Sequence, residues 1–283
     1  MQPLPTMYAF RDAGELSPTR WKPRLVACTK EPSHSDDPGE MFVVKYRRGS
    51  QSTAANISEV ICHGLLLASG IPTLDAVLIS VSNSLSSSYR LSDVIDYDVM
   101  PGLHFGTRHR TDVQPGDSNI RVDDLAQPEQ LIDIWVFDCW TMNIDRATYG
   151  NILMARDHRG KWQLVACDQS DCFGGSGRFA DGSFMGIAEG NVPSESCSCL
   201  IEAIYRTDGR AVSRAVDRIT GALGSVQSAV ERVPDQWWDQ SAVKPEEVER
   251  CLNLRCRMLP DICQAKKWGD INDACRGGYI LGT

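Results

Sequence analysis

Two acids and an amide in the middle of the chain have the types and the spacing that phosphoryl transfer needs. Asp145 follows an apolar segment, Asn151 comes six residues later, and Asp168 ends a second apolar segment. A carboxylate such as Asp145 can accept or orient the proton of an attacking hydroxyl. The oxygens of Asn151 and Asp168 suit Mg²⁺, which bridges the phosphates of a nucleotide triphosphate. The apolar flanks favour this interpretation over the alternative, in which Asp145 and Asn151 form turns and Asp168 is a strand-end acid.

A lysine and a glutamate precede this set in the order that a nucleotide site requires. Lys45 follows the apolar segment Met41–Val44, and Glu59 lies on the helix predicted next. An ammonium group that faces the α- and β-phosphates needs a carboxylate to fix its orientation, so we predict an ion pair between Lys45 and Glu59. A surface lysine and a solvated glutamate are the alternative interpretation.

Two further segments bear on the site. The stretch from His104 to Arg110 contains two histidines and two arginines. It is expected either to bind a phosphate or acidic substrate beside the site or to form a solvated basic loop. The long polar loop Thr29–Glu40 is expected to cover the phosphates, although it lacks the Gly-x-Gly spacing of a tight phosphate cradle, and it offers Thr29, Ser33 and Ser35 as candidate phosphate acceptors.

Composition narrows the class of protein. The chain has 283 residues, 42% of them hydrophobic, which is enough for one large core or for two lobes around a cleft. Its formal net charge of −8 argues against general binding to nucleic acids or anionic membranes. No segment has the length and apolar character of a membrane span, and no export signal is recognisable in Met1–Arg20, so we expect a cytoplasmic protein. The eleven cysteines are irregularly spaced, which predicts reduced thiols rather than zinc sites or disulfides.

Hydrophobic periodicity divides the chain into a strand-rich first part and a helix-rich second part. The predicted strands are Pro23–Cys28, Met41–Tyr46, Leu74–Ser82, a strand pair or a strand with a short connection within Tyr89–Met100, and the hairpin Asn151–Arg156 and Trp162–Asp168. The predicted helices are Ala55–Ser69, Pro128–Met142, Pro193–Tyr205, Gly209–Val233 and Lys244–Ile262. A serine-rich turn is expected over Asn83–Ser88, and a hinge at Pro101–Gly106.

With these residues in place, the chain resembles the HipA-like kinase family, and more distantly the phosphoinositide 3-/4-kinases. The resemblance spans roughly residues 20–262. It is carried by seven pieces in family order: Phe42–Tyr46, Ser58–Glu59 with Leu67–Pro72, Leu103–Gly106, Asn143–Arg146, Gly150–Leu153, Cys167–Ser170 and Pro234–Trp237. The chain departs from the family pattern in the six-residue step from Asp145 to Asn151 and in Gln169-Ser170 after the second acid.

The resemblance implies an α+β, two-lobed protein-kinase-like fold. Residues 20–105 would form an N-lobe with an antiparallel sheet and one helix, and residues 106–283 a mainly helical C-lobe. It also implies ATP and Mg²⁺ as cofactors, with Lys45 on the phosphates, Glu59 as its partner, and Asp145 as catalytic acid or base. Asn151 and Asp168 would be the metal ligands.

The phosphate acceptor remains open at this point. A protein Ser/Thr hydroxyl is favoured by the resemblance, and a small molecule or a lipid is the alternative within kinases. A nucleotide-binding pseudokinase, which binds a partner without catalysis, is the alternative outside enzymes. A protein partner fits each of these readings.

Overall fold

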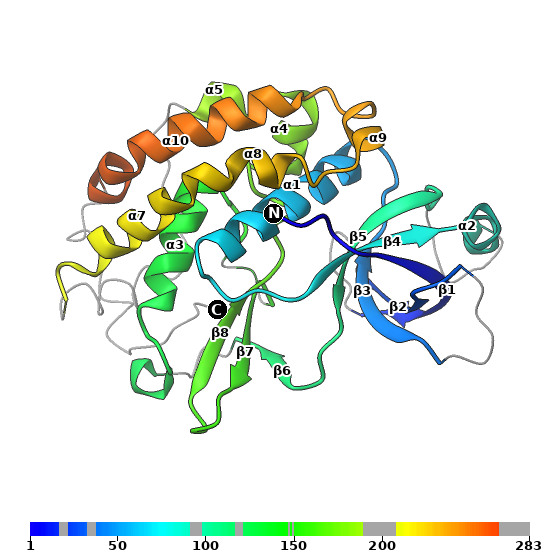
Figure 1. Ribbon diagram of the computed structural model, residues 1–283, viewed down its shortest axis with the longest axis horizontal. Coiled ribbons are helices and arrows are strands. Elements are labelled where there is room, and N and C mark those ends of the chain that lie inside the picture. Colours follow the sequence, from blue (N-terminus) through cyan, green and yellow to red (C-terminus); the bar gives the residue numbers. More distant parts are fainter. Residues whose placement is uncertain are drawn as a thin grey trace.

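A closed five-stranded barrel forms the first part of the molecule. The computed structural model describes residues 1–16, 22–32, 38–90, 98–116, 121–146, 148, 150–188 and 208–265. The barrel order is β1-β2-β3-β5-β4 (Figure 1). Its strands are β1 (Thr6–Glu15), β2 (Arg24–Thr29), β3 (Glu40–Lys45), β4 (Ala76–Val81) and β5 (Gly102–Arg108). The neighbouring pairs are antiparallel except β1 and β4, whose parallel pairing closes the barrel.

The fold is mixed α and β, but the predicted antiparallel sheet with one helix needs two corrections. The first is strand β1, which the sequence analysis did not assign and which lies before residue 20. Its pairing with β4 joins residues about 70 positions apart, such as Thr6 and Leu78, and this converts an open sheet into a barrel. The apolar run Met7–Phe10 is the local signal that could have revealed the strand.

The second correction is helix α2 (Asn83–Arg90), which replaces the expected serine-rich turn. The Ser82 hydroxyl accepts the backbone N–H of Leu85 at 3.2 Å and so caps the first turn. Tyr89, one helical turn after Leu85, is buried with the residues that fill the barrel. Tyr89 therefore belongs to a helix and not to the expected strand pair, of which residues 91–97 lie outside the described part of the chain.

Alternation along β3 separates the barrel interior from the cavity that holds Lys45. Val44 and Tyr46 are buried in the cluster that fills the barrel, together with Phe42. Successive side chains of a strand point to opposite faces, so Val43 and Lys45 point outward. Both of them line the cavity described below.

Helix α1 (Ser50–Ala68) follows β3 and packs against α4 (Ser176–Asp181) and α8 (Val226–Val230) (Figure 1). It begins five residues earlier than predicted, because the Ser52 hydroxyl accepts the backbone N–H groups of Arg48 and Gly49. Gly70, with a φ of 70°, stands just beyond its C-terminal end as expected.

The second part of the molecule contains a three-stranded sheet and a group of helices. The sheet has the order β6-β7-β8, and its β7–β8 hairpin confirms the prediction. These strands are β6 (Val113–Pro115), β7 (Ile152–Arg156) and β8 (Trp162–Ala166). The remaining elements are η1 (Val122–Asp124), α3 (Gln130–Thr141), α5 (Met185–Ala188), α7 (Ala211–Gly221), η2 (Ala222–Ser225), α9 (Asp235–Trp238) and α10 (Pro245–Ala265). The helix predicted over Gly209–Val233 is thus divided into α7, η2 and α8, and the one predicted over Pro193–Tyr205 lies outside the described residues.

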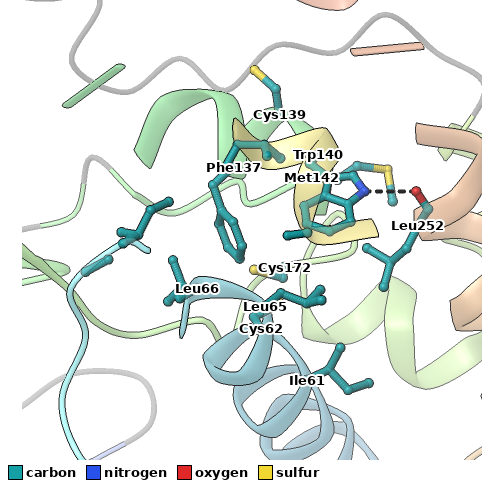
Figure 2. Packing of buried hydrophobic residues seen from close by; sticks show 14 of the residues in the cluster. Ile61, Cys62, Leu65, Leu66, Phe137, Cys139, Trp140, Met142, Cys172 and Leu252 are labelled. Atoms are coloured by element: carbon teal, nitrogen blue, oxygen red, sulfur yellow. Dashed lines mark hydrogen bonds between the residues drawn. The ribbon is translucent and has the colours of Figure 1, made fainter. Parts of the chain in front are cut away.

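The main core forms where α1, α3 and α10 meet (Figure 2). Every residue of α3 is buried. Leu65 of α1 and Phe137 and Trp140 of α3 lie in one cluster, and the Trp140 indole N–H donates to the Leu252 carbonyl of α10 at 2.8 Å. Because α1 contributes to this core, the helix that carries Glu59 is anchored in the helical part of the molecule.

Three other expectations concern the domain boundary, the state of the cysteines and the lack of a membrane span. The expected boundary between residues 105 and 106 falls within β5, and the division into two lobes stays a prediction. The cysteines within the described residues are free, whereas Cys197, Cys199 and Cys275 lie outside them. In the described part of the chain, no helix has the length and apolar character that crossing a membrane requires.

His104 fixes the place where the chain leaves the barrel after β3. Its Nδ1 accepts the backbone N–H of Arg47 at 2.9 Å, so the ring proton is on Nε2, which donates to the Met100 carbonyl at 2.9 Å. Burial, assisted by the nearby Arg47 cation, lowers the pKa of His104 to about 3. The folded protein therefore holds this ring neutral through the pH range in which an unfolded chain protonates it.

We expect this difference to destabilise the protein in mild acid. Below an unfolded-state pKa of about 6.5, the unfolded chain binds a proton that the fold excludes, so stability falls as the pH falls. Between pH 7 and pH 5 the wild type should lose about 2 kcal/mol more than His104→Gln, measured by urea unfolding. His158→Gln, in the exposed β7–β8 turn, is the matched control. Equal pH profiles for wild type and His104→Gln would contradict the prediction.

Candidate functional site

A cavity of about 490 Å³ lies between the barrel and the β6-β7-β8 sheet. The barrel contributes Val43, Lys45, Phe105 and Thr107, which share the outward face because Val43 pairs with Thr107 and Lys45 with Phe105. The second part contributes Asn151, Leu153 and Asp168. The cavity therefore combines apolar walls with convergent polar groups, which is typical of a small-molecule site.

The predicted ion pair between Lys45 and Glu59 is confirmed. Lys45 Nζ lies 2.6 Å from Glu59 Oε1, and it also pairs with Asp168 Oδ1. The second oxygen of Glu59 accepts the backbone N–H of Gln169 at 3.0 Å. One buried carboxylate thus connects the barrel lysine to the segment that carries Asp168.

These contacts set the charges of the three groups. Burial alone would lower the pKa of Lys45, but Asp168 and Glu59 raise it above its usual range. Burial would raise the pKa of Asp168, yet the Lys45 ammonium and the Ser170 hydrogen bonds keep it below the usual value. For Glu59, burial outweighs the attraction of Lys45, and its pKa is raised. Lys45 is therefore a cation at neutral pH and Asp168 an anion.

Asp168 stands in an uncommon backbone conformation just after β8. Its φ is 55°, in the left-handed region that non-glycine residues rarely adopt. The Ser170 hydroxyl donates to Asp168 Oδ1 at 2.5 Å, which helps to hold this turn. Strained residues of this kind persist where the surrounding contacts over-determine them, and they cluster at functional sites.

Asp145 and Asn151 lie side by side on the loop between α3 and β7. Asn143 Oδ1 accepts the Asp145 backbone N–H at 2.9 Å, which forms a tight turn after α3. Asn151 Nδ2 donates to the Asp145 carbonyl at 2.7 Å and to its Oδ2 at 3.1 Å. The Asn151 amide oxygen therefore points the other way, and Asn151 lines the cavity.

Arg146 holds this loop and both flanking segments together. Its guanidinium pairs with Asp138 of α3 at 3.0 Å, and both side chains are buried. It also donates to the carbonyl oxygens of Asn151, at 2.7 Å, and of Cys167, at 2.6 Å, and to Gln169 Oε1 at 2.7 Å. Arg146 therefore holds the loop of Asp145 and Asn151 against α3 and the segment after β8.

Two segments are placed differently from the expectation. His104 is buried inside the barrel, so of the four basic side chains in this segment only those of Arg108, His109 and Arg110 line the cavity. The loop Thr29–Glu40 connects β2 and β3 at the far end of these strands from Lys45. This follows from the register, in which Cys28 pairs with Glu40 while Arg24 pairs with Val44, next to Lys45.

Leu16, just after β1, and Pro23, just before β2, line the cavity instead. Thr29 lines a different cavity, and Ser33 and Ser35 lie outside the described residues. The expectation failed because the sequence analysis did not assign β1. It therefore took the β2–β3 hairpin for the first hairpin of the sheet, although β1–β2 is the first.

Two comparisons with known proteins found similar sequences or folds. The family model for HipA-like kinases matches residues 28–175, just over half of the chain. The crystal structure of the Helicobacter pylori proinflammatory kinase CtkA is similar in fold, with a TM-score of 0.57 and 13% identity over 93% of this chain and 98% of that one.

The Shewanella oneidensis MR-1 toxin–antitoxin complex of HipA, HipB and operator DNA contains a more distantly similar chain. Its TM-score is 0.39 and its identity 11%, over 90% of this chain and 66% of that one. No curated protein is significantly similar to the chain in sequence.

The Arg146–Asp138 pair generates a stability prediction. Asp138→Asn leaves a buried guanidinium opposite a neutral amide, and we expect the free energy of unfolding to fall by about 3 kcal/mol in urea titrations. Asp133→Asn on the same helix is the matched control, because its partner Arg218 is 45% exposed. That variant should lose about 1 kcal/mol or less. Similar losses in the two variants would show that Arg146 does not depend on Asp138.

Proposed function

The chain belongs to the HipA-like kinase family, and we propose that it is an ATP- and Mg²⁺-dependent phosphotransferase that moves the γ-phosphate to a hydroxyl. The observation that carries the proposal is the Lys45 ammonium, held between Glu59 and Asp168 at the wall of a largely apolar cavity. A fixed cation beside a carboxylate suited to a metal is the arrangement that orients a triphosphate. Val43, Phe105 and Leu153 supply apolar surface for the nucleotide base.

The residues fit a magnesium ion. In the described part of the chain no three His, Cys, Asp or Glu side chains cluster tightly enough to hold a metal alone. Mg²⁺ differs from such metals, because it commonly takes one or two protein oxygens and completes its shell with phosphates and water. Lys45 and Ser170 both contact Asp168 Oδ1, which leaves Oδ2 for a cation. Asp168 Oδ2 and the Asn151 amide oxygen would hold Mg²⁺, which would neutralise charge on the β- and γ-phosphates.

Asp145 is the proposed acid or base. It is half-buried, and the Asn151 amide and the Thr148 hydroxyl both donate to its carboxylate. Those two donors fix its orientation, so it would receive the proton of an incoming hydroxyl while Lys45 and the metal hold the phosphates. Ile144, next to it, is 63% exposed, which places Asp145 at an open edge where an acceptor can approach.

We propose a protein Ser/Thr hydroxyl as the acceptor, as the family favours. A small-molecule or lipid hydroxyl is the second candidate, because the same side chains serve those acceptors. A pseudokinase is disfavoured, since the chain retains Lys45, Glu59, Asp145, Asn151 and Asp168.

Two aspartate variants test the assigned roles. In calorimetric titrations with a non-hydrolysable ATP analogue, Asp168→Ala should weaken binding at least about tenfold and abolish its dependence on Mg²⁺, because a metal ligand is lost. Asp145→Ala should change the affinity less than about threefold while it lowers phosphoryl transfer by about 100-fold or more. Asp181→Ala, on the exposed end of α4, is the control. If both active-site variants bind the analogue equally, the two roles are wrongly assigned.

Intact-mass spectrometry tests the acceptor class. After incubation of the full chain with ATP and Mg²⁺, a protein kinase is expected to add about 80 Da per phosphate to itself or to an added protein substrate, each phosphate bringing a charge near −2. Lys45→Met is the control for contaminating kinases. ATP consumption that requires a metabolite or lipid pool, with no phosphate on protein, would overturn the Ser/Thr assignment in favour of the second candidate.

A further inference from the structure

Arg47 is a buried cation at the junction between β3 and α1, two residues after Lys45. Its side chain is almost completely buried, at 1% exposure. Its backbone is fixed on both sides, because the N–H donates to His104 Nδ1 and the carbonyl accepts the Met100 N–H, both at 2.9 Å. Lys45 is therefore two residues away from a residue whose backbone cannot shift without losing its hydrogen bonds to His104 and Met100.

The guanidinium of Arg47 contacts both parts of the molecule. Toward the barrel and the start of α1, it donates to the Leu103 carbonyl at 3.0 Å and to the Thr53 hydroxyl at 3.2 Å. Toward α9, it donates to Gln240 Oε1 and lies 5.3 Å from the centre of the Trp237 ring. None of these four groups carries a negative charge.

Such an environment is hard to explain by stability alone. A buried cation loses its hydration, and an apolar side chain of similar size commonly serves a core at least as well. Burial lowers the pKa of Arg47 to about 10, so the side chain is still charged at neutral pH. What a guanidinium offers, and an apolar chain does not, is a rigid fork of donors that fixes several groups in one geometry.

The geometry of Lys45 depends on two carboxylates that lie outside the barrel. Glu59 and Asp168, the two partners of Lys45, lie on α1 and after β8, and α1 packs against helices of the second part (Figure 1). Lys45 itself belongs to the barrel. The bridge from Arg47 to Gln240 and Trp237 is a second connection across the same boundary, at the point where β3 leaves the barrel.

We propose that Arg47 is a positioning residue for Lys45: by bridging the β3–α1 junction to Gln240 and Trp237 of the α9 region, it keeps the lysine in register with Glu59 and Asp168. The effect of this positioning role on ATP binding rests on the proposed function. The effect on the position of Lys45 does not rest on the proposed function.

The test uses the full chain and three variants. Gln240→Ala removes the bridge from its exposed end, Gln240→Glu offers Arg47 a carboxylate in the same place, and Gln227→Ala on α8 is the control, because it removes an exposed hydrogen bond to Glu231. The rate at which an amine-selective acylating reagent labels Lys45 is measured by peptide mass spectrometry, with exposed Lys161 as the internal reference. An ammonium held in two ion pairs is protonated and reacts slowly.

We expect Gln240→Ala to label Lys45 about fivefold faster than the wild type, and to bind the ATP analogue more weakly by a similar factor, as loss of one hydrogen bond at the bridge implies. Gln240→Glu and Gln227→Ala should match the wild type. Unchanged labelling in folded Gln240→Ala would overturn the proposal. Faster labelling in a chain that never binds the analogue would support the positioning role and refute the nucleotide site, so the two failures are distinguishable. Arg47→Met, if folded, should behave like Gln240→Ala; if it does not fold, Gln240→Ala decides.

Discussion

The ion pair between Arg146 and Asp138 fixes the wall of the cavity that carries Asn151 and Asp168. The positions of the other polar groups in the site depend on this pair. Asp138 is on α3, the most deeply buried helix, so its carboxylate has a fixed position. From there the Arg146 guanidinium reaches the carbonyls of Asn151 and Cys167, one on each side of the β7–β8 hairpin. The loop of Asp145 and the turn of Asp168 are therefore held by one side chain. A buried cation needs such a full set of partners, because each unsatisfied donor would add to the cost of its desolvation.

A continuous series of polar contacts leads from this pair to the barrel. Arg146 donates to the Gln169 side chain, the Gln169 backbone donates to Glu59, and Glu59 pairs with Lys45. Gln169 occupies the position at which the chain departs from the family pattern. Its amide oxygen is the acceptor that Arg146 requires, so the departure is accommodated within the site. Hydrogen bonds and ion pairs in such a series reinforce one another in a low dielectric.

Local patterns predicted the parts of the site that adjacent residues define. Lys45 on its strand, Glu59 on the next helix and the β7–β8 hairpin all follow from periodicity of two or about four residues. Barrel closure was not predictable in this way, because it depends on the pairing of Thr6 with Leu78. The helix at Asn83 was missed because serine and asparagine are turn formers by local propensity, and the burial of Tyr89 against the barrel residues is a tertiary contact that local propensity does not include. The contact of Arg47 with Gln240 spans 193 positions, and no spacing rule reaches so far.

Closure of the barrel also determines how this half of the molecule can be recognised. An open sheet presents an edge strand whose free N–H and C=O groups can pair with a strand from another chain. In the barrel, each of the five strands has a neighbour on both sides, and the parallel pair β1–β4 occupies the place where an edge would be. Over these paired segments the barrel offers no free strand edge for β-strand addition. A protein that recognises them must do so through side chains and connecting loops, which can change while the strands that position Lys45 stay the same.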